Sequence, residues 1–367
     1  MIEEDYFIYE FPNDKKEERK EKKRISEKDR SKYKKTDQKK LKASLKRLKV
    51  KSKKGLFKGV VTSIQSNRIN VSYEGINHVC SLRGSFKKQK TLMKNIIAVG
   101  DKVYFEKLQD MEGVISLIEE RHSILSRSDN LLHKQEQIIA VNVDQVIITS
   151  SIVIPPLKPY LIDRYIIAAK KGNMSPIIVI NKCDLDENKT VFLKEIQLAE
   201  ELKKTYESLG IPTLLTSIKT GQGLEQIKVL MKDKITVFSG QSGVGKSAMI
   251  KALTGYDLLV GNTINKTKKG SHTTTQAQLL SLENGGWCID TPGIKSFGLW
   301  NIERSHLDEY FDEIHALAPF CGFKSCTHTH EPECLVKEKV QAGEISSLRY
   351  QSYLSLREFL LKKHQSR

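Results

Sequence analysis

Hydrophobic and polar residues alternate with a period of two in the part of the chain that follows residue 54. Residues 69–73 read Ile-Asn-Val-Ser-Tyr, the pattern of a strand with one buried face. Gly100-Asp101 predicts a turn, and Gly113 is expected to interrupt a further apolar run before Val114. Several short strands therefore predict a small β-barrel over residues 55–127. Basic residues in its middle loop favour an oligonucleotide-binding (OB) barrel: Arg83, Lys87, Lys88 and Lys90.

From about Val143 the pattern changes to apolar runs that alternate with amphipathic stretches. The apolar runs predict buried strands at Gln145–Ser150, Pro176–Asn181, Pro212–Ser217, Ile235–Ser239 and Trp287–Asp290. The stretches between them predict helices at Asp163–Lys171, Lys189–Leu209, Leu224–Lys232 and Lys246–Leu253. This order predicts an α/β domain with a mostly parallel sheet covered by helices on both faces. After Asn301 we expect a helical segment, a Cys/His cluster and a final helix from about Glu344.

Residues 240–247 read Gly-Gln-Ser-Gly-Val-Gly-Lys-Ser and fit the phosphate-binding pattern G-x-x-x-x-G-K-[ST]. The run lies between a predicted strand and a predicted helix, which is the context that the motif requires. Its glycines allow backbone N–H groups to point at phosphates, and the helix N-terminus adds positive potential. Lys246 is expected to reach the β- and γ-phosphates, and the Ser247 hydroxyl to bind Mg²⁺. The expected loop contacts are Gly240, Ser242, Gly243, Val244, Gly245, Lys246 and Ser247.

Asp290-Thr291-Pro292-Gly293 follows another predicted strand. We expect Asp290 to hold Mg²⁺ through water, and the Gly293 N–H to meet the γ-phosphate and so respond to hydrolysis. Between the two motifs lies a threonine-rich run after His272. Either Thr273 or Thr274 is a candidate for the Mg²⁺ shell in the triphosphate state.

Asn181-Lys182-Cys183-Asp184 follows the predicted strand that ends at Asn181. The Asp184 carboxylate can accept hydrogen bonds from guanine N1–H and N2–H₂, and adenine lacks this donor pair, so the motif favours GTP over ATP. Lys182 can lie along the base, and Asn181 can brace the loop. Ser217-Ile218 follows the next strand and fits the loop whose backbone N–H reads guanine O6.

The order of these motifs is unusual, because the base-reading motif precedes the phosphate-binding loop. The strands can still be neighbours if the domain is circularly permuted. In that order the segment after Gly293 leads directly into the C-terminal region, so we expect movement there to reach the Cys/His cluster.

Cys321, Cys326, His328 and Cys334 form the pattern C-x₄-C-x-H-x₅-C. Three thiolates and one imidazole suit a tetrahedral structural Zn²⁺ and argue against Mg²⁺ or an open catalytic site. His330 is an alternative to His328. The surrounding region has few apolar residues, so we expect the metal to contribute to its folding.

The charge is concentrated near the N-terminus. The chain has 367 residues and a net charge of +17, and residues 14–54 contain 21 Lys and Arg against 7 Asp and Glu. This tract has too few apolar residues to fold alone, which predicts a solvated extension, and it is also suited to binding RNA. The remaining cysteines are scattered (Cys80, Cys183 and Cys288), and no apolar run approaches the ~20 residues of a membrane helix. We therefore expect a cytoplasmic protein without a membrane segment.

These residues together resemble the RsgA/YjeQ family, the small-ribosomal-subunit-dependent GTPases of bacteria. The resemblance covers about residues 55–367 and depends on the permuted motifs, His272-Thr273-Thr274, the cysteine pattern, and Gly343, Arg349-Tyr350 and Tyr353. It implies an OB barrel (55–127), a circularly permuted P-loop GTPase domain (128–300) and a small zinc-binding helical domain (301–367). Before these domains, the composition predicts a disordered basic extension (1–54).

The resemblance also implies late assembly of the small ribosomal subunit, contacts with its rRNA and with other assembly factors, and a GTPase stimulated by the subunit. We expect a monomer with one structural Zn²⁺ and Mg²⁺ bound with GTP. Ile294 stands where many GTPases have a water-orienting Gln, and the resemblance assigns His272 to that task. Ser271 and Ile218 depart from common family residues, and Gly243 stands where potassium-dependent GTPases have Asn.

Two other functions are compatible with parts of the sequence. One is an RNA-binding scaffold whose nucleotide site turns over negligibly. The other is a permuted GTPase of large-subunit assembly, which the barrel before Asn181 and the cysteines after Gly293 disfavour.

Overall fold

The computed structural model describes residues 55–65, 68–83, 96–128, 136–184, 190–256, 277–283, 285–290, 302 and 304–365. The chain separates into two units, residues 1–54 and 55–367, and all described residues belong to the second unit. The predicted basic extension and the loop lysines Lys87, Lys88 and Lys90 lie outside the described residues.

A closed five-stranded barrel follows residue 55. Its strands are β1 (Phe57–Gln65), β2 (Arg68–Tyr73), β3 (Ile76–Leu82), β4 (Lys102–Lys107) and β5 (Glu112–Ile118). They run in the order β1-β2-β3-β5-β4, and β4 pairs back onto β1. Ile69 and Val71 point into the core beside Val103, Phe105 and Ile115. The predicted OB-type barrel is thus confirmed.

The expected break at Gly113 is wrong. Gly113 lies inside β5, between Cys80 of β3 and Lys107 of β4. A Cβ at this position would lie 2.8 Å from Cys80 Sγ and 2.8 Å from a Phe105 ring carbon. The glycine therefore permits close packing inside the barrel. The turn lies just before it, at Asp110 and Met111, where φ is 54° and 59°.

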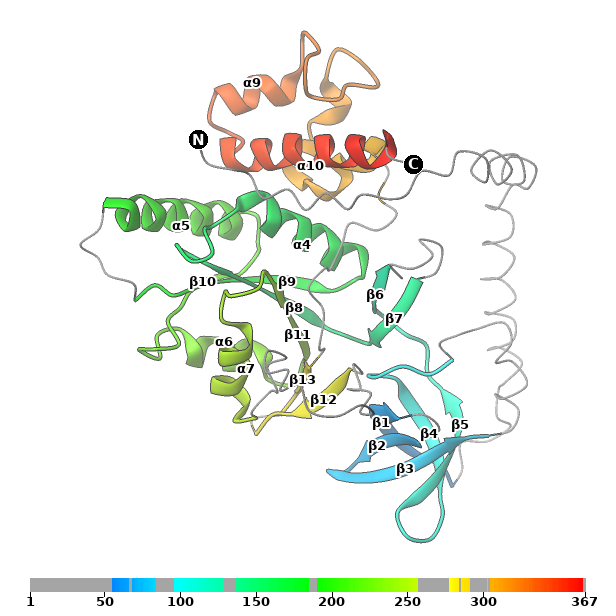
Figure 1. The fold of residues 1–367 in the computed structure, drawn as a ribbon. Helices are drawn as coiled ribbons and strands as arrows, with labels where there is room; N and C mark the ends of the chain where they lie inside the picture. The colour runs from blue at the N-terminus through cyan, green and yellow to red at the C-terminus, as the bar shows by residue number, and fades with distance from the viewer. Residues whose placement is uncertain are drawn as a thin grey trace, which may run out of the picture. The chain divides into compact units, whose positions relative to one another are not determined.

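A second group of strands and helices follows Gln145 (Figure 1). The strands are β8 (Gln145–Ser151), β9 (Ser175–Asn181), β10 (Thr213–Leu215), β11 (Ile235–Gly240), β12 (Gln278–Ser281) and β13 (Trp287–Asp290). The helices are α4 (Pro159–Lys171), α5 (Thr190–Ser208), α6 (Leu224–Met231) and α7 (Lys246–Thr254). The strand order is β10-β9-β8-β11-β13-β12, parallel except for β12.

Helices cover both faces of this sheet, as predicted. Val146 and Ile148 of β8 pack in one apolar cluster with residues of α4 and α5. Ile147, on the opposite face of the same strand, packs in another cluster with residues of α6 and α7. Every residue of β8 and β11 is buried, which explains why these strands are continuous apolar runs in the sequence.

Two features of the sheets were not predicted. Ser63 of β1 pairs with Gln278 of β12, so the barrel and the parallel sheet form one hydrogen-bonded set of 11 strands. A separate hairpin, β6 (Ile124–Ser128) with β7 (Glu136–Val141), lies between them in the chain.

The C-terminal module consists of short helices and one long helix. Its elements are η1 (Arg304–His306), η2 (Asp308–Tyr310), α8 (Asp312–His315), η3 (Ala318–Phe320), α9 (Leu335–Gln341) and α10 (Ser347–Gln365). Contrary to expectation, the module has an apolar cluster of its own, which includes Phe311, Ile314, Tyr353 and Leu356. Ile167 of α4 completes this cluster, and α10 runs alongside α4 (Figure 1). The module therefore does not depend on a metal alone for its packing.

Candidate nucleotide and zinc sites

The phosphate-binding sequence forms a loop between the buried strand β11 and helix α7, which begins at Lys246. Gly240 has a φ of 142°, and a Cβ there would lie 2.0 Å from the Thr149 carbonyl oxygen. Gly245 has a φ of 98°, and a Cβ there would lie 2.6 Å from Asn181 Nδ2. Only glycine fits at these two positions, because strain and neighbouring atoms exclude a side chain.

Lys246 folds back over this loop. Its Nζ donates hydrogen bonds to the carbonyl oxygens of Gly240, at 2.7 Å, and Gln241, at 2.5 Å. Val244 is buried, whereas Ser242 and Gly243 are exposed. Ser247 lies in the first turn of α7 and is partly exposed. A cation beside a helix N-terminus is an arrangement that attracts phosphate.

The base-reading sequence contacts the phosphate-binding loop directly. Asn181 is buried at the end of β9, and its Nδ2 donates to the Val244 carbonyl at 2.9 Å. Lys182 Nζ donates to the Gly243 carbonyl at 2.7 Å and also to the Ile154 carbonyl. Residues more than sixty positions apart in the chain therefore meet at the carboxyl edge of the sheet, as the permuted order of the motifs predicts.

Asp184 and Ser217 form the second half of the base-reading region. Ser217 Oγ donates to Asp184 Oδ1 at 2.7 Å and accepts from the Thr220 N–H at 3.2 Å. Ser217 is fully buried and Asp184 is partly exposed, so the serine fixes a carboxylate that remains accessible. Ile218 packs against the apolar cluster beneath α6 and α7.

One contact in this region was not predicted from the sequence. The loop between β8 and α4 borders the phosphate-binding loop, since a Cβ on Gly243 would lie 3.7 Å from Pro155 Cδ. Ser151 Oγ donates to the Pro155 carbonyl at 2.7 Å, which holds the loop in place. The Pro155-Pro156 pair, which begins four residues after the end of a buried strand, is the signal that marks it.

The remaining predicted residues of the nucleotide site are described only in part. Asp290 ends β13, which lies beside β11 in the sheet. Its backbone therefore lies at the same edge as Gly240. His272, Thr273, Thr274 and Gly293 lie outside the described residues.

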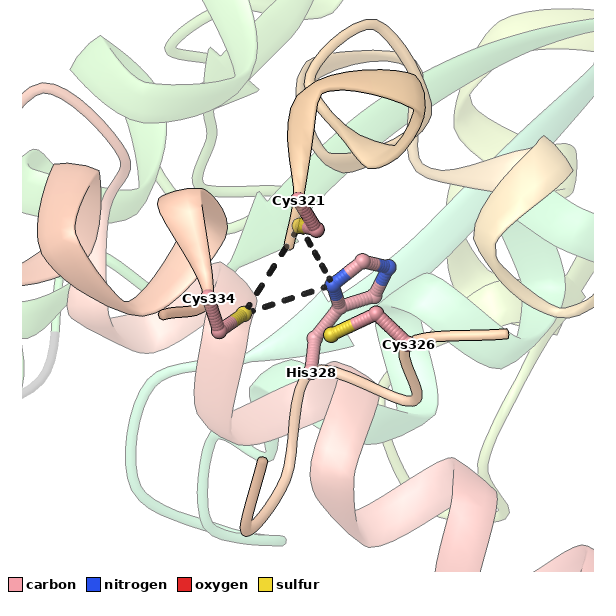
Figure 2. Close-up of side chains that lie close together, drawn as sticks. All are labelled: Cys321, Cys326, His328 and Cys334. Atoms are coloured by element: carbon pink, nitrogen blue, oxygen red, sulfur yellow. Dashed lines mark hydrogen bonds between the residues drawn. The ribbon is translucent and has the colours of Figure 1, made fainter. Parts of the chain in front are cut away.

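The four predicted zinc ligands converge in the C-terminal module (Figure 2). Their ligand atoms all lie within 4.8 Å of one another. Cys321 Sγ lies 3.9 Å from Cys334 Sγ and 3.6 Å from His328 Nδ1, and Cys334 Sγ lies 3.5 Å from the same nitrogen. Tetrahedral zinc with ordinary bond lengths separates its ligand atoms by about 3.5–3.8 Å. The spacing and the soft donor set fit Zn²⁺.

Helix α10 holds the backbone around His328 in place. Tyr350 Oη donates to the His328 carbonyl at 2.6 Å, and Tyr353 Oη donates to the Thr327 carbonyl at 3.1 Å. His328 is buried and has a φ of 57°. His330 is exposed, with Nδ1 3.0 Å from Thr329 Oγ1, so His328 is the histidine in the cluster.

The Glu331 carboxylate organises the same turn. Burial acts to raise the pKa of Glu331, but hydrogen bonds from the Thr327 side chain and from backbone N–H groups outweigh this effect and lower that pKa. The backbone N–H groups of Thr327 and Thr329 donate to it at 2.9 and 3.0 Å.

Known proteins share both the sequence and the fold. Residues 118–300 match the family model described as RsgA GTPase. A protein of Chlorobaculum parvum named small ribosomal subunit biogenesis GTPase RsgA is 41% identical over 275 residues, which cover 72% of this chain and 86% of that protein. The chain belongs to the RsgA family. The RsgA of Thermotoga maritima is 37% identical over 303 residues, which cover 82% of this chain and 95% of that protein.

Solved structures agree with this assignment. The crystal structure of YjeQ from Thermotoga maritima matches with a TM-score of 0.67 and 35% identity, over 83% of this chain and 99% of the other. YloQ, described as a circularly permuted GTPase, matches with a TM-score of 0.66 and 28% identity. The match covers 86% of this chain and 98% of the YloQ chain. The predicted family, the permuted fold and the enzyme class, a GTP hydrolase, are therefore confirmed. In the described part of this RsgA-family chain, no helix is both long and apolar enough to cross a bilayer.

Proposed function

We propose that this chain binds the small ribosomal subunit, assists its late maturation, and hydrolyses GTP to GDP and phosphate when the subunit stimulates it. The observation that carries the nucleotide part is the pair of hydrogen bonds from Asn181 and Lys182 to Val244 and Gly243. A guanine at Asp184 and a phosphate chain at residues 240–247 then belong to one bound molecule.

Each predicted residue has one task in this proposal. Asp184 reads guanine, with Ser217 orienting its carboxylate and the Ile218 backbone facing O6. Lys246 and the loop N–H groups stabilise charge on the phosphates. Mg²⁺, when bound with GTP, neutralises charge that develops on the β- and γ-phosphates. Ser247, Asp290 and Thr273 or Thr274 are the residues that would hold it, and His272 would orient the attacking water.

The C-terminal cluster has a structural role in the same proposal. Cys321, Cys326, His328 and Cys334 would hold one Zn²⁺ with no open position, because all four ligands come from the chain. The metal then fixes the turn that Tyr350 and Tyr353 support from α10.

The binding partner is inferred from the names of the relatives and from the net charge of this chain. Relatives at 41% and 37% identity are named small ribosomal subunit biogenesis GTPases. The chain's net charge of +17 fits contact with rRNA. We infer a cytoplasmic monomer that meets the rRNA of the subunit and other assembly factors there.

Hydrolysis assays with purified ribosomal subunits test this function. We expect multiple turnovers of GTP that small subunits accelerate and large subunits do not. Equal rates with and without small subunits would support the RNA-binding scaffold instead. Acceleration by large subunits alone would support a function in large-subunit assembly.

A further inference from the structure

The loop that carries the first two zinc ligands exposes two phenylalanines. Phe320 is 73% exposed and Phe323 is 47% exposed. Among the described residues, Phe320 is the most exposed large hydrophobic side chain. Pro319 beside it is exposed as well. Exposed aromatic side chains that gather on one surface are typical of interaction sites.

The backbone under both rings is fixed by several contacts. Phe320 ends η3, where its N–H donates to the Leu317 carbonyl at 3.0 Å. The Cys326 N–H donates to the Phe323 carbonyl at 3.1 Å, and the Gly322 N–H donates to the Glu333 carbonyl at 3.1 Å. Phe323 is therefore hydrogen-bonded to the predicted zinc ligand Cys326, and Phe320 directly precedes the predicted ligand Cys321 in the chain. The two Cα atoms lie within about 11 Å of each other, because only three residue steps separate them.

The charge of the C-terminal module does not suit RNA. Residues 302–365 contain eight Lys and Arg and ten Asp and Glu, whereas the whole chain has a net charge of +17. Between Phe323 and Cys334 in the chain, Lys324, His330 and Glu333 are exposed. Three thiolates on the proposed divalent zinc ion would add a further negative charge. RNA-binding surfaces carry a clear excess of positive charge, which this module lacks.

We propose that Phe320 and Phe323 form a protein-docking surface whose shape the zinc site maintains. The partner is a basic protein with an apolar pocket, since this combination complements two exposed rings on a slightly acidic module. Aromatic anchors in such pockets contribute much of the affinity of a protein interface. The inference depends on the proposed function to the extent that we look for this protein on the small subunit.

The test compares two binding partners, intact small subunits and the same rRNA after its proteins have been removed. Binding of the unaltered chain to intact subunits is measured first, and a lack of binding there refutes the proposed function and this docking surface together. The variant is Phe320→Ala with Phe323→Ala. Its matched control is Leu193→Ala with Val229→Ala, because these side chains are 51% and 67% exposed on α5 and α6. Zinc content is measured for every variant.

We expect the phenylalanine variant to bind intact subunits at least tenfold more weakly, with unchanged zinc content and unchanged affinity for free rRNA. The control variant is expected to bind like the unaltered chain. An equal loss of affinity for free rRNA would show that the rings stack on bases and would overturn the proposal. Unchanged affinity for intact subunits would overturn it too.

A photocrosslinker in place of one ring gives an independent result. Phe323→p-benzoylphenylalanine is irradiated on purified small subunits, and the product is treated with protease or ribonuclease. A crosslink to a subunit protein supports the proposal, and a crosslink to rRNA contradicts it.

Discussion

Asp163 on α4 and Arg349 on α10 form an ion pair whose side chains are 0% and 3% exposed. Tyr206 Oη donates to the same Asp163 oxygen at 3.0 Å, and Arg349 Nε donates to Glu313 at 2.6 Å. The Phe311 ring lies 4.3 Å from the guanidinium. Burial acts to lower the pKa of Arg349, but Asp163 and Glu313 outweigh burial and raise that pKa. This pair fixes the C-terminal module on the nucleotide-binding domain.

Removal of the arginine is expected to be costly. Arg349→Met leaves Asp163 and Glu313 without their cation, so we expect a loss of about 3–5 kcal/mol in the free energy of unfolding. Urea denaturation followed by circular dichroism measures it. The matched control is Lys170→Met, which removes an exposed pair with Asp312 at 2.7 Å between α4 and α8. That change is expected to cost at most about 1 kcal/mol, and similar losses for the two variants would contradict the prediction.

The second prediction concerns the base. We expect GTP to bind with roughly 10⁴-fold preference over ATP, because adenine would leave the Asp184 carboxylate without its donor pair. Asp184→Asn should lose guanine nucleotides and gain xanthine nucleotides, since the amide inverts the hydrogen-bonding pattern. Ser217→Ala should weaken GTP binding without changing the preferred base, because it removes the 2.7 Å bond that orients Asp184. Titration calorimetry measures these affinities. Comparable affinity of the unaltered chain for ATP and GTP would contradict the assignment of Asp184 as the guanine-reading residue.

The zinc site gives a prediction with a close control. We expect one zinc per chain, and His328→Ala or Cys326→Ser should lose it. His330→Ala should keep it, because that side chain is exposed two residues away. Elemental analysis of protein purified without chelator provides the measurement. GTP affinity should persist in the metal-free variants, since the sheet has separate apolar clusters. Retention of zinc by His328→Ala would show that the ligand set is different.

Deletion of residues 1–54 tests the basic extension. Residues 14–54 carry 21 basic and 7 acidic side chains, so the deletion should weaken rRNA binding at low salt and flatten its salt dependence. Zinc content and unstimulated GTP hydrolysis should not change. If the salt dependence is the same with and without the extension, the segment makes no phosphate contacts.

The last prediction concerns His272. No arginine lies between Ser247 and Asp290, and Ile294 cannot orient water. Unstimulated hydrolysis should therefore be slow, on the order of 10⁻⁴–10⁻² s⁻¹. His272→Ala should lose most of the stimulation by small subunits and keep its GTP affinity, whereas Lys246→Ala should lose both affinity and turnover. Single-turnover hydrolysis with saturating subunits decides this, and a rate equal to that of the unaltered chain would exclude a role for His272 in catalysis.

The parts of the fold that the sequence predicts are those with a local cause. The parallel strands are continuous apolar runs because both of their faces are covered, and Gly240 and Gly245 are required by local backbone geometry. The pairing of Ser63 with Gln278 could not be predicted, because β1 and β12 meet there at one residue pair that has no characteristic sequence. Asp163 and Arg349 were missed as a pair for a similar reason. The residues next to each of them in the chain form no motif that marks an ion pair. Only tertiary packing brings together two residues that are 186 positions apart.

Helix α4 also constrains the synthesis of the chain. Asp163 and Ile167 leave the ribosome long before α10 exists. In a nascent chain the Asp163 carboxylate therefore has Tyr206 but no cation, and Ile167 lacks its neighbours of the C-terminal module, until Arg349 and the residues around it have been translated. A product that stops before α10 retains this uncovered surface on an otherwise complete nucleotide-binding domain. Proteases that recognise exposed apolar segments then have a means of separating truncated chains from full-length ones.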